Sequence, residues 1–181
     1  MTKHRELASE LTVQPVDRIG VDASIIFSDI LVIPEAMGME LKLEEGKGGP
    51  RFDKPIRLYT QIRDLKIVSA AADLGYVTDA IKATLEKLQG RVPLIGFSGS
   101  PWTLFCYMVE GHGSQVFRYA MEMIFTRPED AHTLLGKIRD AVSDYTVAQT
   151  AQGAHTVQIL DTGAVLLTPT GLRTSDVCHT S

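Results

Sequence analysis

Cysteine is scarce in this chain of 181 residues, which contains two cysteines and one tryptophan. Cys106 and Cys178 are far apart and lie in different surroundings, so we expect free thiols in a reducing compartment. No run of about 18 apolar residues exists, which argues against a membrane-spanning helix. The N-terminal stretch MTKHRELASELTV is charged and lacks the apolar core of a secretory signal. We therefore expect a cytoplasmic protein without a membrane partner.

The chain also has no excess of positive charge. It carries 18 basic and 22 acidic residues, a formal net charge of −4, and both signs are scattered along the sequence. Nothing resembles the basic stripe that a phosphate backbone requires. We therefore expect no nucleic-acid partner.

Metal and cofactor motifs are missing as well. The five histidines show no HExxH or similar spacing, so a metal site is not expected. Gly46, Gly48 and Gly49 resemble a phosphate loop only superficially, because no GK[ST] ending and no helix follow them. Gly96-x-x-Gly99 is not a dinucleotide fingerprint. The residues therefore predict no metal site and give no clear signal for phosphate or dinucleotide binding.

The chain does have a globular composition, 44% apolar and 22% charged, and enough length for one domain. Strand and helix patterns alternate along it. The predicted strands cover 23–33, 94–97 and 156–160, and both faces of the first are expected to be buried at Ile25–Phe27. The predicted helices cover 74–88, a stretch around 116–124, and 128–145. Residues 38–55 are predicted as a long exposed loop or hairpin. This alternation favours α/β units on a parallel sheet. Because the sequence after Leu167 is polar and aperiodic, we predict a partial (β/α)8 TIM barrel of about three βα units with parallel strands.

The stretch LIGFSGSPWTLFCYMVEG, residues 94–111, combines a strand, a turn of small residues and a helix. Parallel α/β proteins build their sites from such turns, at the carboxyl ends of the strands. Tyr107 lies about one turn into the helix. It either donates a hydrogen bond into the site or packs its ring in the core.

Acidic residues follow the apolar part of two of the predicted strands. Ser28 and Asp29 interrupt the run 23–33 just after the apolar triplet Ile25–Phe27, and Asp161–Thr162 follows the strand 156–160. A partly desolvated carboxylate at Asp29 must find donors or a cation. The alternative is a loop aspartate whose carboxylate accepts hydrogen bonds from nearby backbone amides. If the two strand ends converge on one site, each supports the functional interpretation of the other.

Long motifs of this chain resemble the uroporphyrinogen decarboxylase family of haem and porphyrin biosynthesis. They are FSDILVIPEAMGMELKLEEGKGGPRF at 27–52 and GRVPLIGFSGSPWTLFCYMVEGHGS at 90–114. The flanking ELASELTVQPVDRIGVDASIIFSD, the LGYVTDAI segment and the QGAHTVQILDT segment are similar too. The resemblance runs from about Glu6 to Thr162, and its motifs are long and specific.

The resemblance implies a (β/α)8 barrel, usually a homodimer in the cytoplasm, that acts on a small-molecule substrate. The implied enzyme is a carboxy-lyase that removes carbon dioxide from the four acetate side chains of uroporphyrinogen III to give coproporphyrinogen III, without metal or cofactor. The central aspartate of the family falls on Asp29, its substrate-contacting tyrosine on Tyr107, and its small hydroxyl residue after a barrel strand on Thr162. The resemblance thus implies Asp29 and Tyr107 as catalytic and all three as substrate-binding.

The chain also departs from the family. The arginine-rich, RQAGRY-like loop that binds substrate carboxylates has no counterpart, and the later βα units and late histidine are missing. We expect an internal fragment: residues 1–181 form a single incomplete barrel domain, 6–162 match the family, and 163–181 are a divergent polar tail. Two alternatives remain, an inactive truncated remnant and a corrinoid-linked methyltransferase relative. The latter class uses zinc with His and Cys ligands, a cluster that this span lacks.

Overall fold

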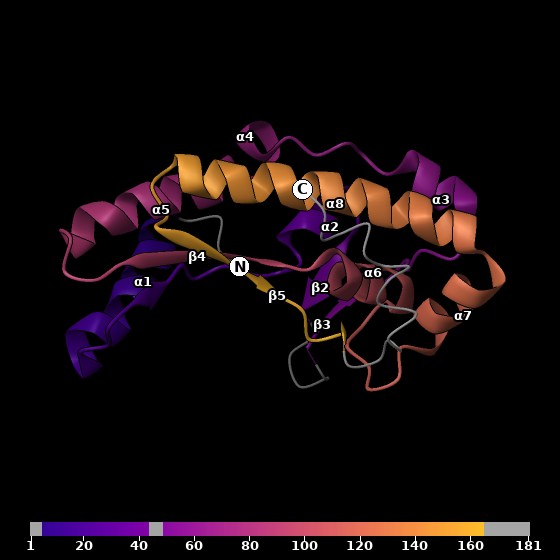
Figure 1. Ribbon diagram of the computed structural model, residues 1–181, viewed down its shortest axis with the longest axis horizontal. Helices are drawn as coiled ribbons and strands as arrows, with labels where there is room; N and C mark the ends of the chain where they lie inside the picture. Colours follow the sequence, from indigo (N-terminus) through magenta and orange to yellow (C-terminus); the bar gives the residue numbers. More distant parts are fainter. Residues whose placement is uncertain (1–4, 44–48, 165–181) are drawn as a thin grey trace.

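The structure, a computed structural model, describes residues 5–43 and 49–164 (Figure 1). Its helices are α1 (Arg5–Ile19), α2 (Val32–Ala36), α3 (Tyr59–Asp64), α4 (Ala70–Asp73), α5 (Gly75–Leu88), α6 (Pro101–Glu110), α7 (Arg118–Thr126) and α8 (Pro128–Ala151). Its strands are β1 (Ser24–Ile25), β2 (Leu41–Leu43), β3 (Pro50–Phe52), β4 (Leu94–Gly99) and β5 (Thr156–Leu160). Most of the expected tail 163–181 lies outside the described residues.

Three of the strands form the predicted parallel sheet, in the order β1-β4-β5. Ile25 on β1 pairs with Ile95 on β4, and Gly99 on β4 pairs with Leu160 on β5. Helix α5 precedes β4 and α8 precedes β5, so helices connect the strands as in βα units. The long helix α8 runs along the sheet beside β4 and β5 (Figure 1). The prediction of a parallel α/β fold is confirmed.

Several element boundaries follow directly from local sequence signals. Helix α5 ends at Leu88, where Gln89 and Gly90 adopt positive φ angles of 50° and 76°, a usual way to terminate a helix. Helix α8 begins at Pro128 and carries Glu129 and Asp130 in its first turn, where proline and negative charge are favoured. Strands β2 and β3 pair antiparallel, so the segment 38–55 contains a hairpin.

The prediction of a strand over 23–33 is wrong in two respects. Strand β1 has only two residues, and Pro34 lies inside the short helix α2. The two faces also differ, because Ile26 is 1% exposed whereas Ile25 and Phe27 are 48% and 39% exposed. Strand β1 is at the edge of the sheet, and helices cover only one of its faces among the described residues.

A buried glutamine explains why β1 stops pairing so early. Ile26 N donates to Ile95 O (2.9 Å), so the backbone groups of that β4 residue face β1. Two residues further along β4, the same direction is taken by Phe97, but its N–H donates to Gln149 Oε1 and its carbonyl accepts from Gln149 Nε2 (both 3.0 Å). A Cβ at Gly96 would lie 2.5 Å from Gln149 Oε1, so any larger residue would force the glutamine side chain to move. The side-chain amide from α8 replaces the strand here.

The core has two parts. The larger one packs α8 against α2, α4 and α6 and includes the fully buried Phe105 and Tyr145. The smaller one lies between α1, α5 and the strands β1 and β4, around Ile26, Ile81 and Leu94. Helix α1 is joined to the segment that follows β1, because Thr12 Oγ1 accepts a hydrogen bond from Phe27 N (2.9 Å).

Candidate active site

The carboxyl ends of β1, β4 and β5 meet at one edge of the sheet. Ile30, which follows Asp29, lies close to the end of β4. A Cβ added at Gly99 would be 3.3 Å from the Cβ of Ile30. On the other side, Ser100 N donates to Leu160 O at the end of β5 (2.8 Å). The convergence of the strand ends, expected from the sequence, is therefore present.

Asp29 lies between the end of β1 and helix α2. Its Oδ1 accepts a hydrogen bond from Leu31 N (2.9 Å), and its carbonyl accepts one from Val32 N (3.4 Å). The carboxylate is half-buried and accepts no other hydrogen bond from the part of the chain that the structure describes. One oxygen is thus held by the backbone, as the loop interpretation predicted, and the second is left for another donor.

The segment after β5 is tied to the first turn of α6. The side chain of Ser100 caps this helix by accepting from Thr103 N (3.0 Å). The hydroxyl of Thr103 donates to Asp161 Oδ1 (2.9 Å), and Trp102 Nε1 donates to Gly163 O (2.9 Å). Pro101 thus begins helix α6, and Trp102 holds the loop that follows β5. The predicted site residue Thr162 lies in this loop and is exposed.

Tyr107 projects from the second turn of α6. Its ring packs on Phe117 with centroids 5.9 Å apart, and a Cβ at Gly113 would lie 3.4 Å from its hydroxyl oxygen. Within the described ranges, no hydrogen bond joins its hydroxyl to Asp29 or Thr162. The structure therefore brings the strand ends of Asp29 and Thr162 together but gives Tyr107 a different set of contacts.

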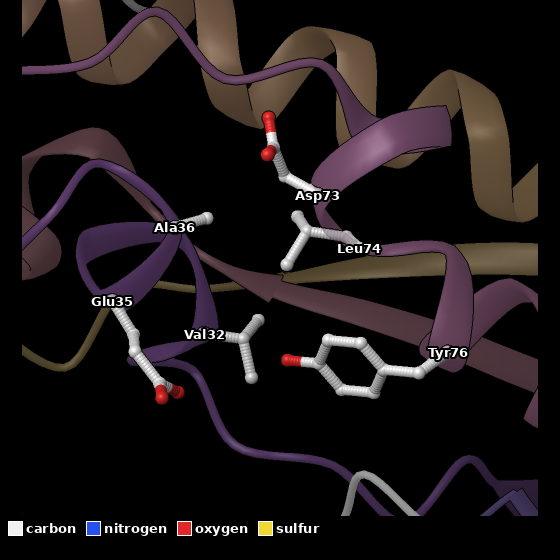
Figure 2. A pocket seen from close by; sticks show the side chains of 6 residues that line it. All are labelled: Val32, Glu35, Ala36, Asp73, Leu74 and Tyr76. Carbon is white, nitrogen blue, oxygen red and sulfur yellow. The ribbon is translucent and has the colours of Figure 1, made fainter.

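A small pocket between α2 and residues 73–76 was not predicted from the sequence (Figure 2). It has a volume of about 140 Å³ and is lined by Val32, Glu35, Ala36, Asp73, Leu74 and Tyr76. Burial, together with the carboxylates of Glu35 and Asp29, raises the pKa of Tyr76 to about 12. An ion pair with Lys66 and a hydrogen bond from Ser69 N lower the pKa of Asp73. The pocket joins α2 to the start of α5, which no sequence motif signals.

The histidines and cysteines were the remaining candidates for metal or thiol chemistry. No group of three or more His, Cys, Asp or Glu side chains that could hold a metal occurs in residues 5–43 and 49–164. His155 Nδ1 accepts from Leu94 N (3.1 Å). Cys106 is a free, buried thiol, and burial raises its pKa. Cys178, His4 and His179 lie outside the described residues.

No helix in the described part of the chain has the length and apolar character of a membrane span.

Solved structures share this fold. One of them is a methyltransferase from Methanosarcina mazei, which superposes with a TM-score of 0.76 at 21% sequence identity over 94% of this chain and 50% of that chain. At this identity the likeness concerns the fold alone. Together with the sheet order, it indicates part of a (β/α)8 barrel.

The sequence comparisons are more specific. The family model for uroporphyrinogen decarboxylase (URO-D) matches residues 1–178. A uroporphyrinogen decarboxylase from Chloroherpeton thalassium is 52% identical over 96% of this chain and 49% of its own length, and one from Hahella chejuensis is 49% identical over 94% and 48%. The chain thus spans about half the length of these curated relatives. With long motifs, a parallel βα fold and converging strand ends all in agreement, the chain belongs to the uroporphyrinogen decarboxylase family.

Proposed function

We propose that this chain carries the central carboxylate of a uroporphyrinogen decarboxylase. The reaction removes the four acetate carboxyls of uroporphyrinogen III and gives coproporphyrinogen III. The observation that carries the proposal is Asp29, which lies where three strand ends converge, in a chain of this family.

The geometry of Asp29 suits a role as an anchor for the macrocycle. Pyrrole N–H groups are hydrogen-bond donors, and the carboxylate oxygen that Leu31 N does not occupy can accept them. Protonation of a pyrrole carbon creates a cation, which the same carboxylate stabilises. The C–C bond to the carboxylate then breaks, its electron pair moves toward this cation and leaves an exocyclic methylene, and carbon dioxide departs. The methylene carbon takes a proton to become a methyl group, and the pyrrole carbon releases the proton that it gained, so each cycle consumes one proton and restores the pyrrole. No metal or organic cofactor takes part in this scheme.

Two further residues complete the proposed site. Thr162 is exposed in the loop that follows β5, so its hydroxyl is available to a substrate carboxylate. The phenol of Tyr107 contributes a hydrogen bond to the bound macrocycle from the side of α6. We assign Asp29 and Tyr107 catalytic roles and all three residues substrate contacts. The free thiol of Cys106 fits a cytoplasmic enzyme, and we propose a homodimer.

A chimera tests this function. Residues 6–162 replace the matching half of the Chloroherpeton thalassium relative, which is 52% identical, and coproporphyrinogen formation is measured. We expect the chimera to be active, and Asp29→Asn to lower its kcat/KM by about 100-fold or more, because a charge-stabilising group is lost. The matched control Asp22→Asn changes an exposed aspartate just before β1 and leaves the rate unchanged.

The same assay separates the alternatives. The chain on its own is expected to show little or no decarboxylation, because the segments that it does not share with its relatives are needed to hold the substrate carboxylates. A folded chimera without turnover would identify the chain as an inactive remnant. A chimera whose activity survives Asp29→Asn would refute the assigned role of Asp29.

A further inference from the structure

The end of α6, one turn beyond Tyr107, contacts β3 and the segment that joins β3 to α3. Phe52 N donates to Gly111 O (2.6 Å), and Ile56 N donates to Met108 O (2.9 Å). Arg51 and His112 form an isolated antiparallel bridge. Gly111 ends the helix with φ +93°, and a Cβ there would lie 3.2 Å from Phe52 O. The turn that follows α6 is therefore held on one side by backbone contacts.

Arg57 extends this attachment with its side chain. Its guanidinium donates to the carbonyls of Val109 and Glu110 in the last turn of α6. These carbonyls have no partner within the helix, and a cation is favoured at this end. The guanidinium carbon also lies 3.8 Å from the centre of the Tyr119 ring on α7. Arg57 thus links the end of α6 to the start of α7.

Glu110 makes the reciprocal link. Its side chain is 7% exposed, and its Oε2 accepts a hydrogen bond from Tyr119 N in the first turn of α7 (3.0 Å). A helix N-terminus favours a carboxylate, which offsets the cost of burying this one. Segment 111–117 is therefore fixed at both ends, by Arg57 and Glu110.

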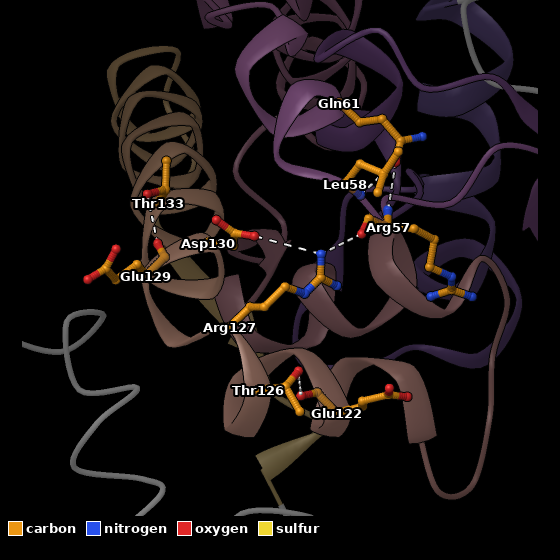
Figure 3. A network of polar contacts seen from close by, with 9 residues as sticks. All are labelled: Arg57, Leu58, Gln61, Glu122, Thr126, Arg127, Glu129, Asp130 and Thr133. Carbon is orange, nitrogen blue, oxygen red and sulfur yellow. Dashed lines mark hydrogen bonds and ion pairs between the residues drawn. The ribbon is translucent and has the colours of Figure 1, made fainter.

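Arg127 binds the backbone of Arg57 through its guanidinium. Figure 3 shows its guanidinium between Asp130 and the backbone of Arg57. Arg127 Nη1 donates to Arg57 O (2.6 Å) and lies 3.7 Å from Asp130 Oδ2 at the start of α8. Gln61 Oε1 accepts from Arg57 N (2.7 Å). The backbone that carries the Arg57 side chain is thus fixed to α3 and α8.

Tyr107 contacts the segment that this arrangement fixes. Both of its contacts described above, Phe117 and Gly113, belong to segment 111–117. We propose that Arg57 and Glu110 are positioning residues that set the orientation of the Tyr107 phenol by fixing segment 111–117. The proposal rests on the proposed function only for the use of that phenol in binding the porphyrinogen.

The test observes Tyr107 directly in the full chain, labelled with fluorotyrosine and studied by 19F NMR. The Tyr107 resonance is assigned with Tyr107→Phe, and the buried Tyr145 on α8 is the internal reference. In Arg57→Ala and Glu110→Ala the Tyr107 resonance should move by more than its linewidth or broaden, while that of Tyr145 stays. Arg57→Lys and Glu110→Gln keep most of the side-chain volume, and they should shift it less, in the same direction.

The matched controls change exposed residues of the same type on neighbouring helices. Arg63→Ala on α3 removes an arginine that pairs only locally with Asp64, and Glu122→Gln on α7 neutralises an exposed carboxylate; both should leave Tyr107 unchanged. An unmoved Tyr107 resonance in folded Arg57 and Glu110 variants overturns the proposal, as does a Tyr145 shift equal to that of Tyr107. Where an alanine variant does not fold, the Tyr107 resonance of Arg57→Lys or Glu110→Gln tests the proposal in its place.

This readout needs no porphyrinogen. A Tyr107 shift combined with an inactive chimera would therefore support the positioning role and refute the proposed function. In an active chimera, Arg57→Lys is expected to raise KM several-fold and to change kcat less, since the orientation of a binding group is altered.

Discussion

Single residues in the candidate site are constrained by backbone geometry as much as by chemistry. Asp29 has one carboxylate oxygen bound by the amide of Leu31, and Asp161 accepts from the hydroxyl of Thr103. Asp161 directly follows β5 and Asp29 lies in the segment that joins β1 to α2, yet Asp161 fastens a loop to α6 whereas Asp29 keeps one oxygen available. The position of an aspartate after a strand does not by itself distinguish a structural role from a binding role. The hydrogen-bond partners of each carboxylate make this distinction.

Gly111 is expected to be intolerant of a side chain. Gly111→Ala should lower the free energy of unfolding by about 1–3 kcal/mol, because φ is +93° and the new Cβ would crowd Phe52 O. Gly136→Ala is the control: Gly136 lies inside α8 with open space around it, so alanine should stabilise by about 0.5–1 kcal/mol. Urea unfolding measures both. Equal effects of the two substitutions would contradict the assigned strain.

The phenol of Tyr76 is expected to affect stability in alkali. Its pKa is raised to about 12 in the folded chain but is about 10 when unfolded. The raised value stabilises the fold fully below about pH 10, and this contribution is lost as the pH rises from about 10 to 12. Tyr76→Phe should therefore make the decline of the unfolding free energy in this range shallower.

The decline will not vanish in this variant, because burial also raises the pKa values of Tyr145 and Cys106. Tyr59→Phe, on a 53% exposed ring of α3, is the control. Urea unfolding across this pH range gives the two profiles. If Tyr76→Phe and the unmodified chain follow the same curve, the phenol has no such role.

Among the secondary-structure elements, β1 and α8 share one side of β4. Where β1 stops pairing, Gln149 satisfies the N–H and C=O of Phe97 from within the core. The amide of a helix side chain thus makes the two hydrogen bonds that a neighbouring strand would make, and Gly96 leaves space for this side chain. This arrangement lets the chain leave the sheet early and turn toward α2, which is what places Asp29 at the strand ends.

Gln149→Leu should be strongly destabilising. It leaves two buried backbone groups of Phe97 without partners, which should lower the free energy of unfolding by about 2–4 kcal/mol. Gln158→Leu on β5 is the control, because Gln158 is exposed and bonds only to the adjacent Ile159 O. Urea unfolding at neutral pH compares them. A loss below that of the control would show that Gln149 is not needed to replace the strand.

For the whole molecule, the main feature is a parallel sheet with two edges and one poorly covered face. Strands β1 and β5 are both edge strands in the sheet that the structure describes, and Ile25, Phe27 and Ile159 are 37–48% exposed. Exposed apolar edges promote association. We expect the isolated chain to be marginally stable and to self-associate.

A charge on the edge strand tests this expectation. Ile25→Lys should reduce self-association in analytical ultracentrifugation and lower the binding of a hydrophobic dye, because lysine on an edge opposes pairing. Lys82→Arg, a charge-conserving change on α5, is the control. A sharp cooperative melt of a monomer that binds no dye would argue against an incomplete sheet.

Much of the fold and part of the candidate site could be predicted from local patterns. The helix 74–88 and the strands 94–97 and 156–160 were predicted within one or two residues, because periodicity and stop signals are local. The family was identified from motifs, and the convergence of the strand ends follows from parallel topology. The extent of β1, the Tyr76 pocket and the role of Arg57 were not predicted.

The sequence by itself determined the family, the parallel βα order and the placement of Asp29 after a strand, because these depend on residues adjacent in the chain. Only the tertiary structure decided how long β1 is and what surrounds Tyr107. Gln149 is 52 residues from Phe97, and Arg57 is 53 residues from Glu110. Such contacts carry no local periodicity, since the partners meet only when α8, α6 and α3 have packed.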